Sequence, residues 1–293
     1  MVCLPAIPGG SRASLAHGPL EVVVTFSILR DLTATIAAGV AEVTSLVGDD
    51  GDTHSYQSKP ADVQCVSRAK LLISNGMGFE RWLPRLLGAA QFSGRHVSAS
   101  EGIAPHIFAT GLGAAGQIPD PHCWHDVANA RRYVANIALG LEAVDAANAS
   151  GYRERAQLFD RRLAALDVWV RQQIGQVPRN KRRVITNHDA FGYFGRAYDV
   201  EFLAVRGMNP EHEPSAREIA ALITLVRKQK IKALFFENLG SPALVEQIAR
   251  DSGGMVGQEL YPDALSSPAG PAASYEALMR HNVSALVAGM REN

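Results

Sequence analysis

Four short polar segments of the sequence each carry one side chain that commonly binds metal ions. These side chains are His54 in Gly51-Asp-Thr-His54-Ser-Tyr, His122 in Asp120-Pro-His122-Cys-Trp-His125, His188 in Thr186-Asn-His188-Asp-Ala-Phe-Gly, and Asp263 in Leu260-Tyr-Pro-Asp263-Ala-Leu. Two lie in each half of the chain. Three imidazoles and one carboxylate would suit a tetrahedral zinc ion, so the four side chains are candidates for one metal site shared by the two halves.

Each segment also has an ordinary interpretation. His54 is surrounded by turn-forming residues, and Asp120 before Pro121 is a good start for a helix, with Asp as N-cap and Pro at the first helical position. His188 also fits a polar neighbour of a helix cap, and Asp263 fits a turn after Pro262. Because no short-range ligand spacing such as C-x₂-C or H-E-x-x-H is present, the local pattern of residues does not decide between these interpretations.

The elements that must position these side chains alternate between strand and helix, which predicts parallel sheets with helices on both faces. Short β-branched or apolar runs predict strands at 20–26, 43–47, 71–75, 96–99, 184–186, 201–205, 233–237 and 255–258. Helical patterns cover 28–40, 60–69, 79–89, 126–146, 152–174, 191–197, 214–229, 242–252 and 274–289. Each of the four segments follows a predicted strand, and ligands in open α/β sheets bind at the carboxyl ends of strands.

The same patterns divide the chain into four parts. Residues 1–18 are rich in Gly, Pro, Ser and Ala, lack periodicity and predict a disordered lead. We then expect an N-terminal α/β lobe over 19–150, a linker helix over 151–175 and a C-terminal α/β lobe over 176–293. A glycine-rich segment over 102–118 predicts a loop that is mobile without metal.

Composition excludes several classes of protein. The 293 residues contain 29 Lys and Arg against 29 Asp and Glu, so the net charge of zero argues against a general nucleic-acid binder. No run approaches the about 18 apolar residues that span a bilayer. The first residues lack the apolar run of a secretory signal. Three cysteines are too few for a disulfide scaffold, although Cys65 and Cys123 could pair if the fold brings them together.

The order of the motifs resembles that of the solute-binding proteins of zinc and manganese ABC importers (cluster A-I, ZnuA-like), from about Val22 to Gly289. The matching pieces are Val24-Thr-Phe-Ser-Ile-Leu, Gly51-Asp-Thr-His54 through Asp62, Asn75-Gly-Met-Gly-Phe-Glu80, Asp120-Pro-His122-Cys-Trp124, Asn187-His188-Asp-Ala-Phe-Gly-Tyr-Phe194, Asn209-Pro-Glu-His-Glu213-Pro-Ser215, Phe235-Phe-Glu237 and Tyr261-Pro-Asp263. The resemblance implies metal ligands at His54, His122, His188 and Asp263. It also implies two (β/α)₄-like domains joined by a long rigid helix, with the metal in the interdomain cleft.

The function implied by the resemblance is capture of one periplasmic Zn²⁺ and its delivery to a membrane permease. On this interpretation the chain is a monomeric, periplasmic binding protein whose signal peptide has been removed, with a periplasmic zinc chaperone as a further candidate partner. Glu213 lies near the expected site and could contact a ligand. The segment before His122 holds only His106, which argues against the His-rich scavenging loop of many zinc-binding relatives.

Three alternatives remain open at this point. Manganese is the other common cargo in the family, but a third imidazole at position 188 favours zinc. A zinc hydrolase keeps an open water position, whereas four protein ligands would close the site, so we do not expect an enzyme. A cell-adhesion role is described for some relatives. Cys3 lacks the preceding residues of a lipoprotein signal, so a lipid anchor has no support in the sequence.

Overall fold

The computed structural model describes residues 19–107, 119–206 and 214–293, and these form two parallel four-stranded sheets. The first contains β1 (Leu20–Val24), β2 (Ala41–Ser45), β3 (Leu71–Ser74) and β4 (Arg95–Ser98), in the order β2-β1-β3-β4. The second contains β5 (Arg183–Thr186), β6 (Glu201–Ala204), β7 (Ala233–Leu234) and β8 (Met255–Val256), in the order β6-β5-β7-β8. The equivalent strand order in both sheets confirms the prediction of two α/β domains.

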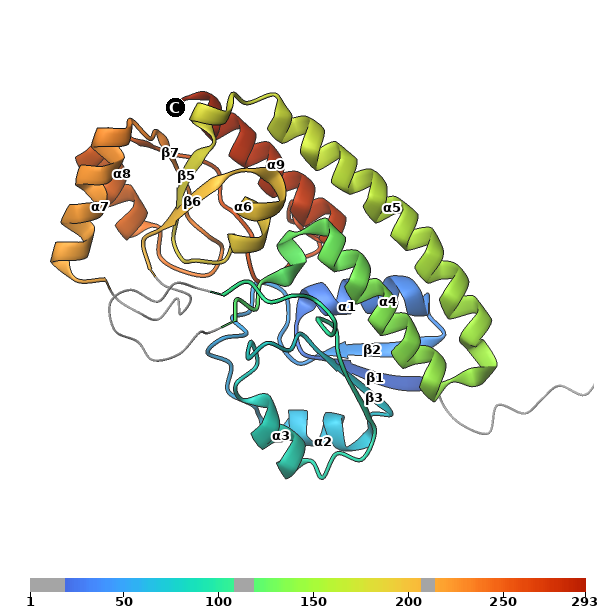
Figure 1. The fold of residues 1–293 in the computed structure, drawn as a ribbon. Coiled ribbons are helices and arrows are strands. Elements are labelled where there is room, and N and C mark those ends of the chain that lie inside the picture. Colours follow the sequence, from blue (N-terminus) through green and yellow to red (C-terminus); the bar gives the residue numbers. More distant parts are fainter. Residues whose placement is uncertain (1–18, 108–118, 207–213) are drawn as a thin grey trace, which may run out of the picture.

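Helices cover both faces of each sheet (Figure 1). They are α1 (Ser27–Ala37), α2 (Pro60–Arg68), α3 (Leu83–Ala89), α4 (Val127–Val144), α5 (Ala149–Gly175), α6 (Gly192–Tyr198), α7 (Ala216–Gln229), α8 (Ala243–Ser252) and α9 (Tyr275–Arg291). In the N-terminal domain, α2 and α3 pack on one face of the sheet, and α1 and α4 on the other. In the C-terminal domain, α7 and α8 cover the face opposite α6 and α9.

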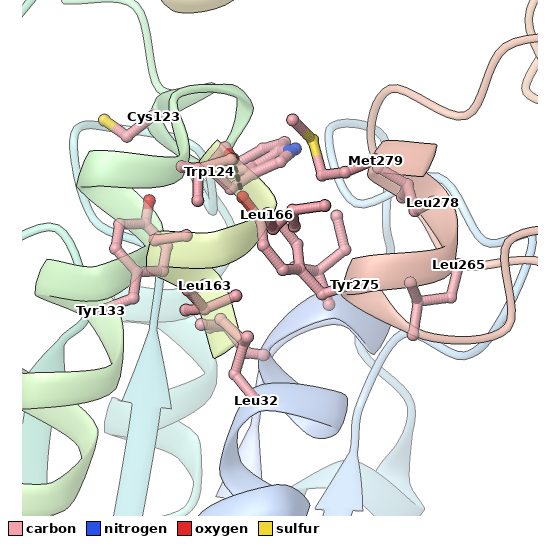
Figure 2. Packing of buried hydrophobic residues seen from close by; sticks show 14 of the residues in the cluster. Leu32, Cys123, Trp124, Tyr133, Leu163, Leu166, Leu265, Tyr275, Leu278 and Met279 are labelled. Atoms are coloured by element: carbon pink, nitrogen blue, oxygen red, sulfur yellow. Dashed lines mark hydrogen bonds between the residues drawn. The ribbon is translucent and has the colours of Figure 1, made fainter. Parts of the chain in front are cut away.

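The long helix α5 runs along both domains. It contacts α1 and α4 of the N-terminal domain and α6 and α9 of the C-terminal domain. Its buried stripe includes Leu163 and Leu166, at the spacing of one helix face. Figure 2 shows these two side chains in a single apolar cluster with Leu32 of α1 and with Tyr275 and Leu278 of α9. The main core is therefore continuous from one domain to the other.

Several element boundaries differ from the predicted ones. The predicted helix over 79–89 begins only at Leu83, because the chain before it forms a tight turn in which Gly76, Met77 and Gly78 all have positive φ. The Glu80 carboxylate accepts the backbone N–H groups of Asn75 (2.6 Å) and Gly76 (3.3 Å), which stabilises this turn. Strand β2 also lies two residues earlier than predicted, and β7 and β8 are shorter.

The pairing of Cys65 and Cys123 that the sequence left open is absent, because both are free thiols. Within the described residues, no helix is both long and apolar enough to cross a membrane.

Some expectations lie outside the described residues: the disordered lead over 1–18, most of the 102–118 loop, and the contact of Glu213 with a ligand.

Candidate metal site

The structure brings the four predicted side chains together. His54 lies in the connection after β2, His122 lies between β4 and α4, His188 follows β5, and Asp263 lies between β8 and α9. One ligand atom from each of the four lies within 4.8 Å of the others. All four side chains lie beyond the carboxyl ends of parallel strands, as predicted for a ligand site in this class of sheet.

Four distances between donor atoms are close to those around a small tetrahedral cation. His54 Nε2 lies 3.2 Å from His122 Nε2 and 3.5 Å from Asp263 Oδ2. His122 Nε2 lies 3.4 Å from Asp263 Oδ1, and His188 Nε2 lies 3.2 Å from Asp263 Oδ2. A tetrahedron with metal–nitrogen bonds of about 2.0–2.1 Å has edges of about 3.3 Å. Four donor pairs are therefore close to the edge length of such a tetrahedron, and the whole set lies within 4.8 Å.

Burial gives a second reason to place a cation here. His122, His188 and Asp263 are at most 1% exposed. The His188 Nε2 atom and both Asp263 oxygens are buried without a hydrogen-bond partner among the described residues. Unpaired polar atoms in a protein interior are costly, and a bound cation would satisfy all three of these atoms at once.

Two buried carboxylates hold the rings of His122 and His188. Asp120 Oδ1 lies 2.7 Å from His122 Nδ1, and Glu237 Oε2 lies 2.5 Å from His188 Nδ1. Each carboxylate also accepts the backbone N–H of its histidine. With the proton held on Nδ1, Nε2 keeps its lone pair for a metal. Sequence reasoning did not assign these partners, although both residues lie within the motifs quoted above.

Electrostatics in the site favour a proton on His188 when no metal is bound. Burial disfavours a charged imidazole, but the carboxylates of Glu237 and Asp263 outweigh that effect and raise the pKa of His188 well above its usual value. Burial likewise acts to raise the pKa of Asp263, but His188 and His122 outweigh it and hold that pKa well below its usual value. Below the raised pKa of His188, metal binding is therefore expected to displace a proton from this ring.

His54 is held differently from the two other histidines. Its side chain is 15% exposed, and its backbone N–H donates to Asp52 Oδ1 (2.8 Å). The ring packs edge-on against Phe79, with 4.7 Å between the ring centroids. The carbonyl of Thr53 accepts a hydrogen bond from Trp82 Nε1 (2.9 Å). His54 is thus the most accessible of the four side chains.

The ring of His125, at the end of the segment that carries His122, is fully buried. It packs against Phe191, with 4.6 Å between the ring centroids. Desolvation lowers the pKa of His125 to about 3, so the ring is neutral at physiological pH. His96 and His281 are hydrogen-bonded, to Ser74 Oγ and to the carbonyl of Glu259 respectively.

Comparison with known proteins identifies the family of this chain. A family described as the periplasmic zinc-uptake complex component A (ZnuA) matches residues 22–289. The chain belongs to this family. The manganese-binding lipoprotein MntA of Halalkalibacterium halodurans is 30% identical over 93% of this chain and 89% of MntA. The iron-binding protein YfeA of Yersinia pestis is also 30% identical, over 92% of this chain and 86% of YfeA.

Solved structures with the same architecture include the periplasmic zinc-binding protein TroA of Treponema pallidum. It has a TM-score of 0.85 and 28% identity, over 93% of this chain and 99% of TroA. A Mn-bound S38A mutant of a periplasmic metal-binding protein from Candidatus Liberibacter asiaticus has a TM-score of 0.84 and 29% identity. The match covers 91% of this chain and 98% of that protein. The chain is therefore the metal-binding component of an ABC importer and not an enzyme, and this role implies a cognate membrane permease.

Proposed function

We propose that this ZnuA-family chain binds one Zn²⁺ through His54, His122, His188 and Asp263 and delivers it to its permease. The observation that carries this proposal is the group of three imidazole nitrogens and one carboxylate, which lie within 4.8 Å of one another and include four donor pairs 3.2–3.5 Å apart. The buried atoms of His188 and Asp263 that make no hydrogen bond among the described residues support it, because a divalent cation would be bound by all of them.

The chemistry of the donors favours zinc over manganese. Imidazole nitrogen suits zinc, whereas manganese prefers oxygen donors, and at a given nitrogen-rich site zinc also binds more tightly in the usual order of divalent metals. Manganese is the second candidate because both Asp263 oxygens face the histidines, at 3.4 Å from His122 and 3.2 Å from His188. A carboxylate bound through both oxygens would raise the number of oxygen donors.

Competitive titration tests the choice of metal. The apo protein is expected to bind one zinc per chain and to prefer zinc to manganese by several orders of magnitude, because three of its four ligands are imidazoles. The measurement is metal stoichiometry by elemental analysis after equilibration with both ions. Displacement of zinc by equimolar manganese would contradict the proposal.

The remaining parts of the proposal concern organisation and location. We propose an N-terminal lobe over 19–150 and a C-terminal lobe over 176–293, with residues 151–175, most of α5, as their connector. We also propose that the chain acts as a periplasmic monomer and that a zinc chaperone is a candidate donor of its metal. Relatives named as lipoproteins or as periplasmic proteins support a location outside the cytoplasmic membrane.

A further inference from the structure

Asn75 is a buried polar residue that the metal site does not use directly. It lies immediately after β3 and is 0% exposed. Its backbone N–H donates to Glu80 Oε1 (2.6 Å), and its carbonyl accepts hydrogen bonds from Ser98 Oγ and from the N–H of Ser100, both at 3.1 Å. The main chain of Asn75 is therefore fixed on both sides by the loops at the carboxyl ends of β3 and β4.

The side chain of Asn75 links these loops to the segment that carries His122. Its Nδ2 donates to the carbonyl of Pro121 (2.8 Å) and to that of Gly76 (3.1 Å). Its Oδ1 accepts a hydrogen bond from the hydroxyl of Tyr133 on α4. Because Oδ1 is occupied by a donor, the amide is oriented with Nδ2 toward Pro121.

The position of Pro121 makes this contact relevant to the metal. Proline has no N–H, so its carbonyl is the polar backbone group by which the residue before His122 is anchored. The same carbonyl accepts the N–H of Cys123 (2.8 Å), and the N–H of His122 is held by Asp120 Oδ1 (2.9 Å). The backbone on both sides of His122 is thus fixed by buried hydrogen bonds.

We propose that Asn75 is a positioning residue for the metal site: it holds the Asp120-Pro121-His122 turn at the end of β3 and so fixes His122 Nε2 among the other donors. This inference rests on the proposed function, because it assigns Asn75 an effect on metal affinity through His122. Residues that do not touch the metal but orient one of its ligands contribute about 10- to 100-fold to metal affinity.

Zinc titration of Asn75→Ala tests the assignment. The variant is expected to bind zinc about tenfold more weakly than the parent. Asn136→Ala is the matched control, because Asn136 on α4 donates from Nδ2 to the carbonyls of Ala99 (2.8 Å) and Glu101 (2.9 Å) without touching the His122 turn. The control is expected to lower the melting temperature while keeping zinc affinity within about twofold of the parent.

A double-mutant cycle with His122→Ala separates positioning from general destabilisation. In the His122→Ala background, Asn75→Ala is expected to cause no further loss of zinc affinity, because the ligand that it orients is gone. Parental affinity in Asn75→Ala, or the same loss in both backgrounds, would overturn the assignment. The parent's own affinity tests the proposed function, whereas the ratio of variant to parent tests Asn75.

Tyr133→Phe provides a second variant if Asn75→Ala does not fold. It removes the hydroxyl that orients the Asn75 amide and keeps the aromatic ring in the core. We expect a smaller loss of zinc affinity than in Asn75→Ala, which again disappears in the His122→Ala background. Parental affinity in Tyr133→Phe, or a loss that persists without His122, would count against the inference.

Discussion

Replacing His188 by alanine is expected to weaken zinc binding by on the order of 10²–10³-fold while leaving the protein folded. Structural zinc sites bind with about 10–16 kcal/mol shared among four ligands, so one ligand contributes about 2.5–4 kcal/mol. The fold is expected to persist because both domains bury extensive apolar surface without metal. Competition with a chelator of known affinity measures the loss, and the melting temperature of the apo protein reports on folding.

Two further variants define the scale of this effect. Glu237→Gln keeps a hydrogen-bond acceptor for His188 Nδ1 but removes the buried charge, so a smaller loss of about 10- to 100-fold is expected. His96→Ala removes an exposed histidine that is bonded to Ser74 and should leave zinc affinity unchanged. If His96→Ala lost zinc while His188→Ala kept parental affinity, the site would be misplaced.

Zinc affinity should also fall by at least about 10²-fold between pH 7.5 and pH 5. The ligand form of His188 is neutral, but Glu237 and Asp263 raise its pKa well above the ordinary imidazole value of about 6.5. Below that raised pKa the apo site holds a proton that zinc must displace, and each such proton lowers affinity about tenfold per pH unit. Isothermal titration in buffers of different ionisation enthalpy measures both the affinity and the protons released.

Glu237→Gln provides the control for this pH dependence. Removing the carboxylate charge lowers the pKa of His188, so zinc binding near neutral pH should release fewer protons and depend less on pH than in the parent. A parental protein whose affinity is constant from pH 7.5 to pH 5 would contradict the assignment of His188 as a ligand.

Much of this site is readable from the sequence because parallel strands put their carboxyl ends at one edge of a sheet. His54, His122, His188 and Asp263 each come after a strand-like run, which makes them candidate ligands, and the order of the family motifs then singles them out as one set. The fold class follows equally from the alternation of strands and helices, since that pattern has few alternatives to a parallel sheet.

The partners of the histidines could not be predicted in the same way. Glu237 reaches His188 because β5 and β7 are neighbours in the sheet, and this strand order is a tertiary property that residue spacing does not encode. The late start of α3 depends on the side chain of Glu80 binding backbone groups of the preceding turn. The burial of His125 likewise depends on Phe191, which comes from the other domain.

The continuity of the main core has a thermodynamic consequence. Trp124 lies before α4 and Tyr275 begins α9, yet the Trp124 indole donates to the carbonyl of Pro262 (2.8 Å), and the Tyr275 hydroxyl donates to the carbonyl of Trp124 (2.7 Å). Either domain alone would expose this apolar face and leave these polar groups unpaired. The chain should therefore melt in one cooperative transition, with calorimetric and van't Hoff enthalpies in agreement, despite containing two separate sheets.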